Sequence, residues 1–225
     1  QCFAVSGNAM TKLRPLIILT MFATILKLFG CTPQSKNNDN KLDADTLSQL
    51  AKSVEEFKNR PIHTSLTEDI ISSTPDNTLL QVVFDNVAQK LPADYEKEYA
   101  TVLTWNKSRQ AIYVIWLLEA EVNNGGYNQF YFNSSGQYYK LLPEALLLVG
   151  AKKFSDLTSK ANQTFENENK TITKDQDGTI EGFSKSYDNN PLNKFDDEFY
   201  ALYKIEDLQR LQIEYIRKHQ EEFID

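Results

Sequence analysis

Apolar residues recur at helical spacing along most of the chain after residue 43. In residues 43–57, apolar side chains at steps of three and four predict one helix, which Arg60 and Pro61 close. Its predicted apolar face consists of Leu47, Leu50, Val54 and Phe57. A wider apolar stripe over residues 79–91 predicts a second helix, which stops at Pro92.

The pattern changes in the middle of the chain, where residues 111–118 are apolar on every side. A helix of this kind lies at the centre of a domain, although Ile, Val and Tyr also favour a buried strand. We prefer a helix over residues 108–123, because polar residues on both sides extend the segment beyond strand length. Gly125 and Gly126 then end it in the manner of a C-terminal glycine.

Further helices are predicted by the same periodicity. They cover residues 94–103, 138–149, 154–165, 195–203 and 206–223. Residues 162–190 are polar with few apolar anchors, which predicts a long polar loop before the C-terminal helices. No pair of strands joined by a hairpin turn stands out. The predicted fold class is therefore all-α, a compact bundle of about seven helices.

The N-terminal residues have the order of a signal peptide. Positively charged residues after Met10 precede an apolar run over residues 15–26, and Lys27 comes next. The run is shorter than the roughly 20 apolar residues of a membrane-spanning helix. Residues 28–31, Leu-Phe-Gly-Cys, resemble the lipobox of bacterial lipoproteins, which implies a lipid on Cys31 and removal of the peptide before it. An ordinary cleaved signal peptide and an uncleaved anchor are the alternatives.

These features divide the chain into three parts. Residues 1–30 are interpreted as leader and signal peptide, with residues 1–9 upstream of the expected start. Residues 31–42 are interpreted as a flexible tether, since residues 32–41 contain no apolar side chain. Residues 43–225 form the predicted helical domain. We expect the protein at the cell envelope, held to a bacterial membrane by the lipid on Cys31.

The residue types needed for common catalytic sites are scarce. Both cysteines lie at or before residue 31, so the predicted domain has no disulfide and no cysteine nucleophile. His63 and His219 are the two histidines, and neither lies in a nucleophile motif. No phosphate-binding glycine loop occurs. We expect no cofactor and favour a non-enzymatic protein.

Asp175, Asp177 and Gly178 copy the middle of a calcium-binding loop. Thr173 and Ser184 stand where the first and last ligands would be needed. We therefore expect an Asp-Gly turn and no metal site.

The densest polar segment is residues 119–136, with the sequence EAEVNNGGYNQFYFNSSG. Its order, Glu, then Asn-Gly-Gly, then Gln, aromatics and Asn, resembles the C-terminal domain of the DNA-mimic protein family. Residues 196–200 and 215–218 resemble the family's closing segments, so the resemblance covers about residues 76–223. It implies an all-α fold of largely unassigned function, and an acidic surface that imitates duplex DNA and occupies a DNA-binding protein.

The motif residues are Glu121, Asn124, Gly125, Gly126, Gln129, Asn133 and Gly136. One interpretation is architectural: a helix end and a turn whose polar side chains satisfy loop backbone groups beneath aromatic rings. The other is a ligand-binding or hydrolase-type pocket. Glu119 and Glu121 are two residues apart on the predicted helix and should point to different faces.

Acidic residues are concentrated toward the C-terminus. The formal net charge is −7, and residues 166–225 contain 15 acidic against 8 basic residues. An acidic face that includes Asp196, Asp197 and Glu198 could dock a basic protein. There is no basic and aromatic stripe for nucleic acid, so nucleic acid is not an expected partner.

These observations support three functional hypotheses. The first is a membrane-tethered lipoprotein whose acidic helical domain binds a protein of unknown identity. The second is a pocket around Glu121, Asn124, Gln129 and Asn133. The third is a DNA mimic, placed last because an exported protein faces away from the nucleoid.

Overall fold

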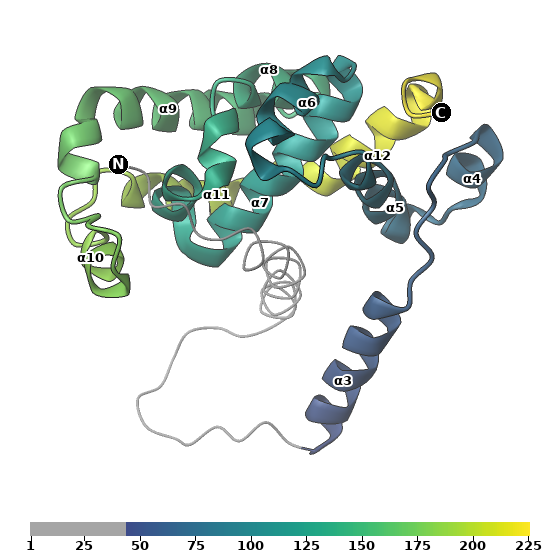
Figure 1. Cartoon of the computed structure of the whole chain (residues 1–225), viewed down its shortest axis with the longest axis horizontal. Coiled ribbons are helices and arrows are strands. Elements are labelled where there is room, and N and C mark those ends of the chain that lie inside the picture. The colour runs from purple at the N-terminus through teal and green to yellow at the C-terminus, as the bar shows by residue number, and fades with distance from the viewer. Residues whose placement is uncertain (1–43) are drawn as a thin grey trace. The chain divides into compact units, whose positions relative to one another are not determined.

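The computed structural model of the chain describes residues 44–225 (Figure 1). The predicted leader, the lipidation site Cys31 and the tether lie outside the described residues. The chain divides into two compact units, Gln1–Pro61 and Ile62–Asp225, and the single helical domain expected over residues 43–225 spans both.

Within the first unit, α3 (Ala44–Lys58) confirms the helix predicted from the first apolar pattern. Leu47 on its apolar face is half exposed. After the helix, the guanidinium of Arg60 lies 3.7 Å from the centre of the Phe57 ring, a cation–π contact at the helix end.

The second unit is all-α, as predicted, and its described residues contain no strand. Its α-helices are α4 (Glu68–Ser73), α5 (Asp76–Gln89), α6 (Glu98–Thr104), α7 (Lys107–Phe132), α8 (Leu142–Leu148), α9 (Lys152–Ile172), α10 (Ile180–Lys185), α11 (Asn193–Leu202) and α12 (Leu208–Lys218). Three short 3₁₀-helices join them: η1 (Tyr95–Lys97), η2 (Ser134–Tyr138) and η3 (Gln220–Glu222). None of the described helices is both long enough and apolar enough to cross a membrane.

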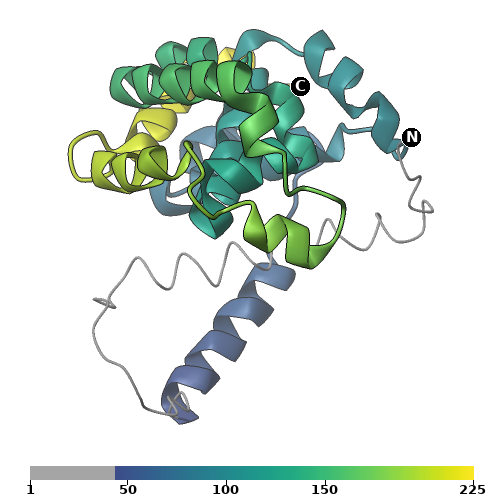
Figure 2. The same ribbon diagram turned by 90° about the vertical axis from the view of Figure 1, so that its left-hand side faces the viewer.

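The central apolar run forms a helix, as we predicted, and not a strand. It is the first half of α7, which packs against α5, α8 and α11 (Figures 1 and 2). Ile112, Ile115 and Leu118 are completely buried there. At roughly 1.5–3 kcal/mol for each large apolar side chain buried, this segment is a main source of the domain's stability.

The structure differs from the sequence predictions in the segment after residue 162 and in the helix α4. The long loop expected over residues 162–190 is much shorter, because α9 continues to Ile172 and α10 comes soon after it. A few apolar side chains are sufficient to pack the end of α9 against the domain: Ile172 is buried, and the Phe165 ring stacks 4.1 Å from that of Tyr131. The short helix α4 was not predicted; Thr67 caps it by accepting the N–H of Ile70.

Candidate functional site

The carboxylate of Glu121 lies at the centre of the motif. Glu121 projects from α7 and is 3% exposed. Its Oε2 accepts hydrogen bonds from Nδ2 of Asn133 at 2.7 Å and Nε2 of Gln129 at 2.8 Å. Its Oε1 accepts one from the hydroxyl of Ser135 at 3.0 Å. All three donors are neutral, and together they provide hydrogen bonds to both oxygens of the carboxylate.

The two glycines break α7 directly beside this cluster. Gly126 has φ +71° and ψ −175°, a backbone conformation essentially reserved for glycine. The helix predicted to end here does end, but a second helical segment begins at Tyr127 and continues to Phe132. The prediction of a C-terminal glycine was therefore right about the break, but it missed the helical segment on the far side of the glycines.

A helix break leaves backbone groups without intrahelical partners, and side chains from later in the chain satisfy them. The hydroxyl of Tyr200 donates to the carbonyl of Val122 at 2.7 Å, and that of Tyr187 donates to the carbonyl of Gly125 at 2.8 Å. The Oδ1 of Asp196 accepts the N–H of Tyr127 at 2.8 Å.

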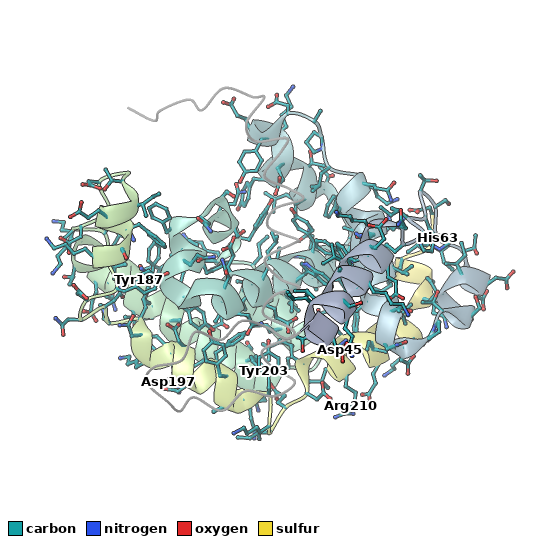
Figure 3. All side chains as sticks on the ribbon, turned by 90° about the horizontal axis from the view of Figure 1, so that it is seen from below. Asp45, His63, Tyr187, Asp197, Tyr203 and Arg210 are labelled. Atoms are coloured by element: carbon teal, nitrogen blue, oxygen red, sulfur yellow. The ribbon has the colours of Figure 1, made fainter. Side chains whose placement is uncertain are left out.

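Asp196 is therefore partly buried and its carboxylate contacts the broken helix, whereas Asp197 and Glu198 of the predicted acidic face are exposed. Burial raises the pKa of its carboxyl group to about 6, with the charge of Asp197 adding to the effect and the Tyr127 N–H opposing it. Burial and the charge of Asp196 raise the pKa of Tyr187 to about 12. Tyr187 and Asp197, the neighbour of Asp196, lie toward the same end of the second unit in Figure 3.

Asn128 forms a second polar contact between α7 and the segment around α10. It is completely buried. Its Nδ2 donates to the hydroxyl of Ser186 at 2.8 Å, and its Oδ1 accepts from Nδ2 of Asn190 at 3.0 Å. The sequence analysis did not single out Asn128, because partners about 60 residues away leave no local signal.

Gly136 permits a close backbone approach. A Cβ atom there would lie 2.8 Å from the carbonyl oxygen of Tyr131 and 2.9 Å from that of Phe130. The backbone carbonyl of Asn133 supports the turn by accepting the N–H of Gly136 at 2.9 Å. Asn124, by contrast, is exposed and takes no part in the Glu121 cluster.

The neighbouring Glu119 points to another face of α7, as predicted. It accepts hydrogen bonds from the Tyr203 hydroxyl at 2.8 Å and from Nε2 of Gln212 at 3.0 Å. Burial is the main cause that raises its pKa. Glu119 and Glu121 therefore have separate donor sets and do not form a carboxylate pair.

A small cavity of about 70 Å³ lies between α7 and α8. It is lined by Lys107, Gln110, Ala111, Val114, Leu141, Glu144, Ala145 and Leu148, none of which belongs to the motif. The polar side chains of the Glu121 cluster bond to one another, which favours the architectural interpretation over the pocket.

The acidic residues of the C-terminal part have varied surroundings. Asp197 and Glu198 are exposed on α11. Asp175 pairs with Lys185 at 3.4 Å, and Asp177 accepts the N–H and hydroxyl of Thr179. Within residues 44–225 no three His, Cys, Asp or Glu side chains are grouped as metal ligands would be.

The fold and the motif define a class of protein: an all-α domain around a broken central helix, whose buried Glu is held by the residues after the Asn-Gly-Gly turn. The chain belongs to the DMP19-like protein family, whose model matches residues 104–219. That range contains the Glu121 cluster, the glycine break and Asp196. No curated protein and no solved structure matches the chain.

Proposed function

We propose that this protein is a non-enzymatic binding domain that uses acidic surface to dock on a basic region of another protein. The observation that carries the proposal is that the polar side chains of the Glu121 cluster are hydrogen-bonded to one another. In this proposal the family motif stabilises the fold, and the exposed surface of the domain recognises the partner.

Charge supports a basic partner. The unit Ile62–Asp225 contains 26 acidic and 16 basic residues. Exposed carboxylates such as Asp197 and Glu198 repel nucleic acid and anionic lipid, and they increase the encounter rate with a cationic surface at low ionic strength.

Membership in the DMP19-like family favours a more specific version, in which the partner is a DNA-binding protein and the acidic domain occupies its DNA site. Competition separates the two versions. A partner captured on the full chain is challenged with a short DNA duplex. Displacement by the duplex would support DNA mimicry, whereas simultaneous binding would restrict the proposal to a basic surface elsewhere on the partner. A full chain that binds no basic protein at low salt would overturn both versions.

We further propose that a lipid on Cys31 tethers the domain to a bacterial membrane. The support is the Leu-Phe-Gly-Cys sequence after a charged and apolar leader. The chain from Met10 is expressed in a bacterium beside Cys31→Ala, with membrane fractionation and mass spectrometry of the N-terminus. We expect a membrane-bound, lipidated wild type and a released or uncleaved variant. If both remain soluble with the leader intact, the tether is refuted and the DNA-mimic version gains weight.

A further inference from the structure

Ile180 is the most exposed large apolar side chain in the described part of the chain. It is 90% exposed at the first position of α10, which lies at one edge of the second unit, far from α4 (Figures 1 and 2). Phe183 lies one helical turn later, and its ring centre is 4.4 Å from that of Phe132, with the two rings tilted by 34°. Phe132 is itself 42% exposed. These three residues form an apolar patch.

The loop before α10 holds Ile180 in this position. The carboxylate of Asp177 accepts the N–H of Thr179 at 3.0 Å and its hydroxyl at 2.6 Å. The Thr179 hydroxyl oxygen in turn accepts the N–H of Gly182 at 2.9 Å and caps α10. A Cβ atom at Gly182 would lie 2.1 Å from Oδ1 of Asp177, so the loop packs directly on the helix.

This loop is also fixed to the core, because Nε2 of Gln176 donates to Oδ1 of the buried Asn128 at 3.3 Å. The segment after α10 is fixed in the same way by the hydrogen bonds of Asn128 with Ser186 and Asn190. Ile180 is therefore displayed by a hydrogen-bonded segment. A backbone segment that is already held in place loses little conformational freedom when a partner binds to it.

The charge of the residues around Ile180 favours a basic partner. Residues 173–190 contain four acidic and two basic side chains. Lys174 and Lys185 both lie within 4 Å of Asp175, at 3.8 and 3.4 Å. Asp177 and Glu181, on either side of Ile180, remain exposed. Two such carboxylates repel DNA, anionic lipid and an identical surface on a second copy.

We propose that Asp177, Ile180 and Glu181, with the Phe132–Phe183 pair beside them, are the docking site for a basic protein surface that contains an apolar recess. We call these five residues the Ile180 surface. The recess receives the Ile180 side chain, while lysine or arginine side chains of the partner face the two carboxylates. This inference rests on the proposed function and assigns it a location.

The test measures binding of the full chain to two synthetic helical peptides of equal length and equal lysine content, one with leucines on its apolar face and the other with alanines. We expect the leucine peptide to bind about tenfold more tightly, because it offers Ile180 an apolar contact. Ile180→Ala should remove most of this preference. Ile205→Ala is the matched control, since Ile205 is 63% exposed and lies outside the surface. Glu181→Gln should weaken both peptides and flatten the salt dependence.

Each outcome has a separate meaning. If neither peptide binds to wild type, the proposed function fails together with this inference. If both bind and Ile180→Ala behaves like Ile205→Ala, basic recognition stands but the Ile180 surface is wrong. Self-association in sedimentation velocity, or binding to phosphatidylglycerol vesicles, would assign another occupant and overturn the proposal if Ile180→Ala removed it. Circular dichroism melting of each variant verifies that the fold is unchanged.

Discussion

The Oδ1 of Asp196 lies 2.8 Å from the backbone nitrogen of Tyr127, at the point where the central helix resumes after its glycine break. A carboxylate is favoured there, because the N–H groups of a helix N-terminus carry partial positive charge. The same position is partly buried, and burial raises the pKa of Asp196 to about 6. The charged form of Asp196 therefore joins α11 to α7 at a cost in stability.

The first prediction concerns the pH dependence of this contact. The pKa of Asp196 is about 6 in the folded chain against an ordinary value of 3.8, so the folded state binds more protons between these values. The stabilisation is complete below pH of about 4 and is lost as the pH rises through 6. Urea unfolding of wild type should therefore lose about 2 kcal/mol more between pH 4 and pH 7 than Asp196→Asn does.

Glu198→Gln is the matched control for this prediction, since Glu198 is exposed on the same helix and does not contribute to the pKa of Asp196. Its unfolding free energy should track the wild-type pH profile. Glu119, whose pKa is also raised, gives a residual slope of the same sign in every variant. A profile of Asp196→Asn that coincides with wild type would show that Asp196 does not titrate in this range.

The second prediction concerns the glycine break. Gly126→Ala should destabilise the fold by about 2–4 kcal/mol, because it adds backbone strain at positive φ and places a Cβ atom 2.2 Å from Oδ2 of Asp196. Gly178→Ala separates the two causes: Gly178 has φ +87°, yet a Cβ atom there has no neighbour within 4 Å. It should cost only about 1 kcal/mol. If chemical denaturation gave equal losses of unfolding free energy for Gly126→Ala and Gly178→Ala, the contact with Asp196 would not contribute to the destabilisation.

The third prediction tests the architectural role of the motif. Glu121→Ala leaves the side chains of Gln129, Asn133 and Ser135 without their shared acceptor, and should lower the free energy of unfolding by about 3 kcal/mol. Glu144→Ala is the control. Its exposed carboxylate pairs with Lys107 at 3.5 Å, and its loss should cost less than about 0.5 kcal/mol. A stable Glu121→Ala protein with altered ligand binding would instead revive the pocket.

The sequence predicted the helical class and the central helix because apolar periodicity is a local property. It also identified Glu121, Gln129 and Asn133 as one motif, and the structure brings these three side chains together. Their order in the family motif indicated the cluster, but helical spacing did not: Gln129 and Asn133 follow Glu121 by 8 and 12 residues, and the break at Gly125 and Gly126 lies between them.

The partners from the C-terminal half were not predictable in this way. Tyr187 and Asp196 meet the glycine break from about 60 and 70 residues further along the chain, and their contacts depend on how α11 packs. Asp196 was assigned to an acidic surface with Asp197 and Glu198 on composition alone. Composition counts charges, but only packing decides which carboxylate turns inward.

The last prediction concerns Asp225, whose side chain joins three parts of the second unit. It lies 2.8 Å from Nζ of Lys90 and 2.9 Å from Nη2 of Arg109, and it accepts the N–H of Leu66 at 3.1 Å. Burial raises its pKa, but these contacts outweigh burial and the pKa is lowered. Its stabilisation is therefore present above the ordinary value of 3.8 and is lost as the pH falls through the lower folded value. Asp225→Ala should lower the free energy of urea unfolding by about 2 kcal/mol at pH 7 and by much less near pH of about 2. The control is Glu221→Ala at an exposed position, whose unfolding free energy should stay near that of wild type at both pH values. A loss that is equal at the two pH values would show that packing, and not the charge of Asp225, holds this end of the chain.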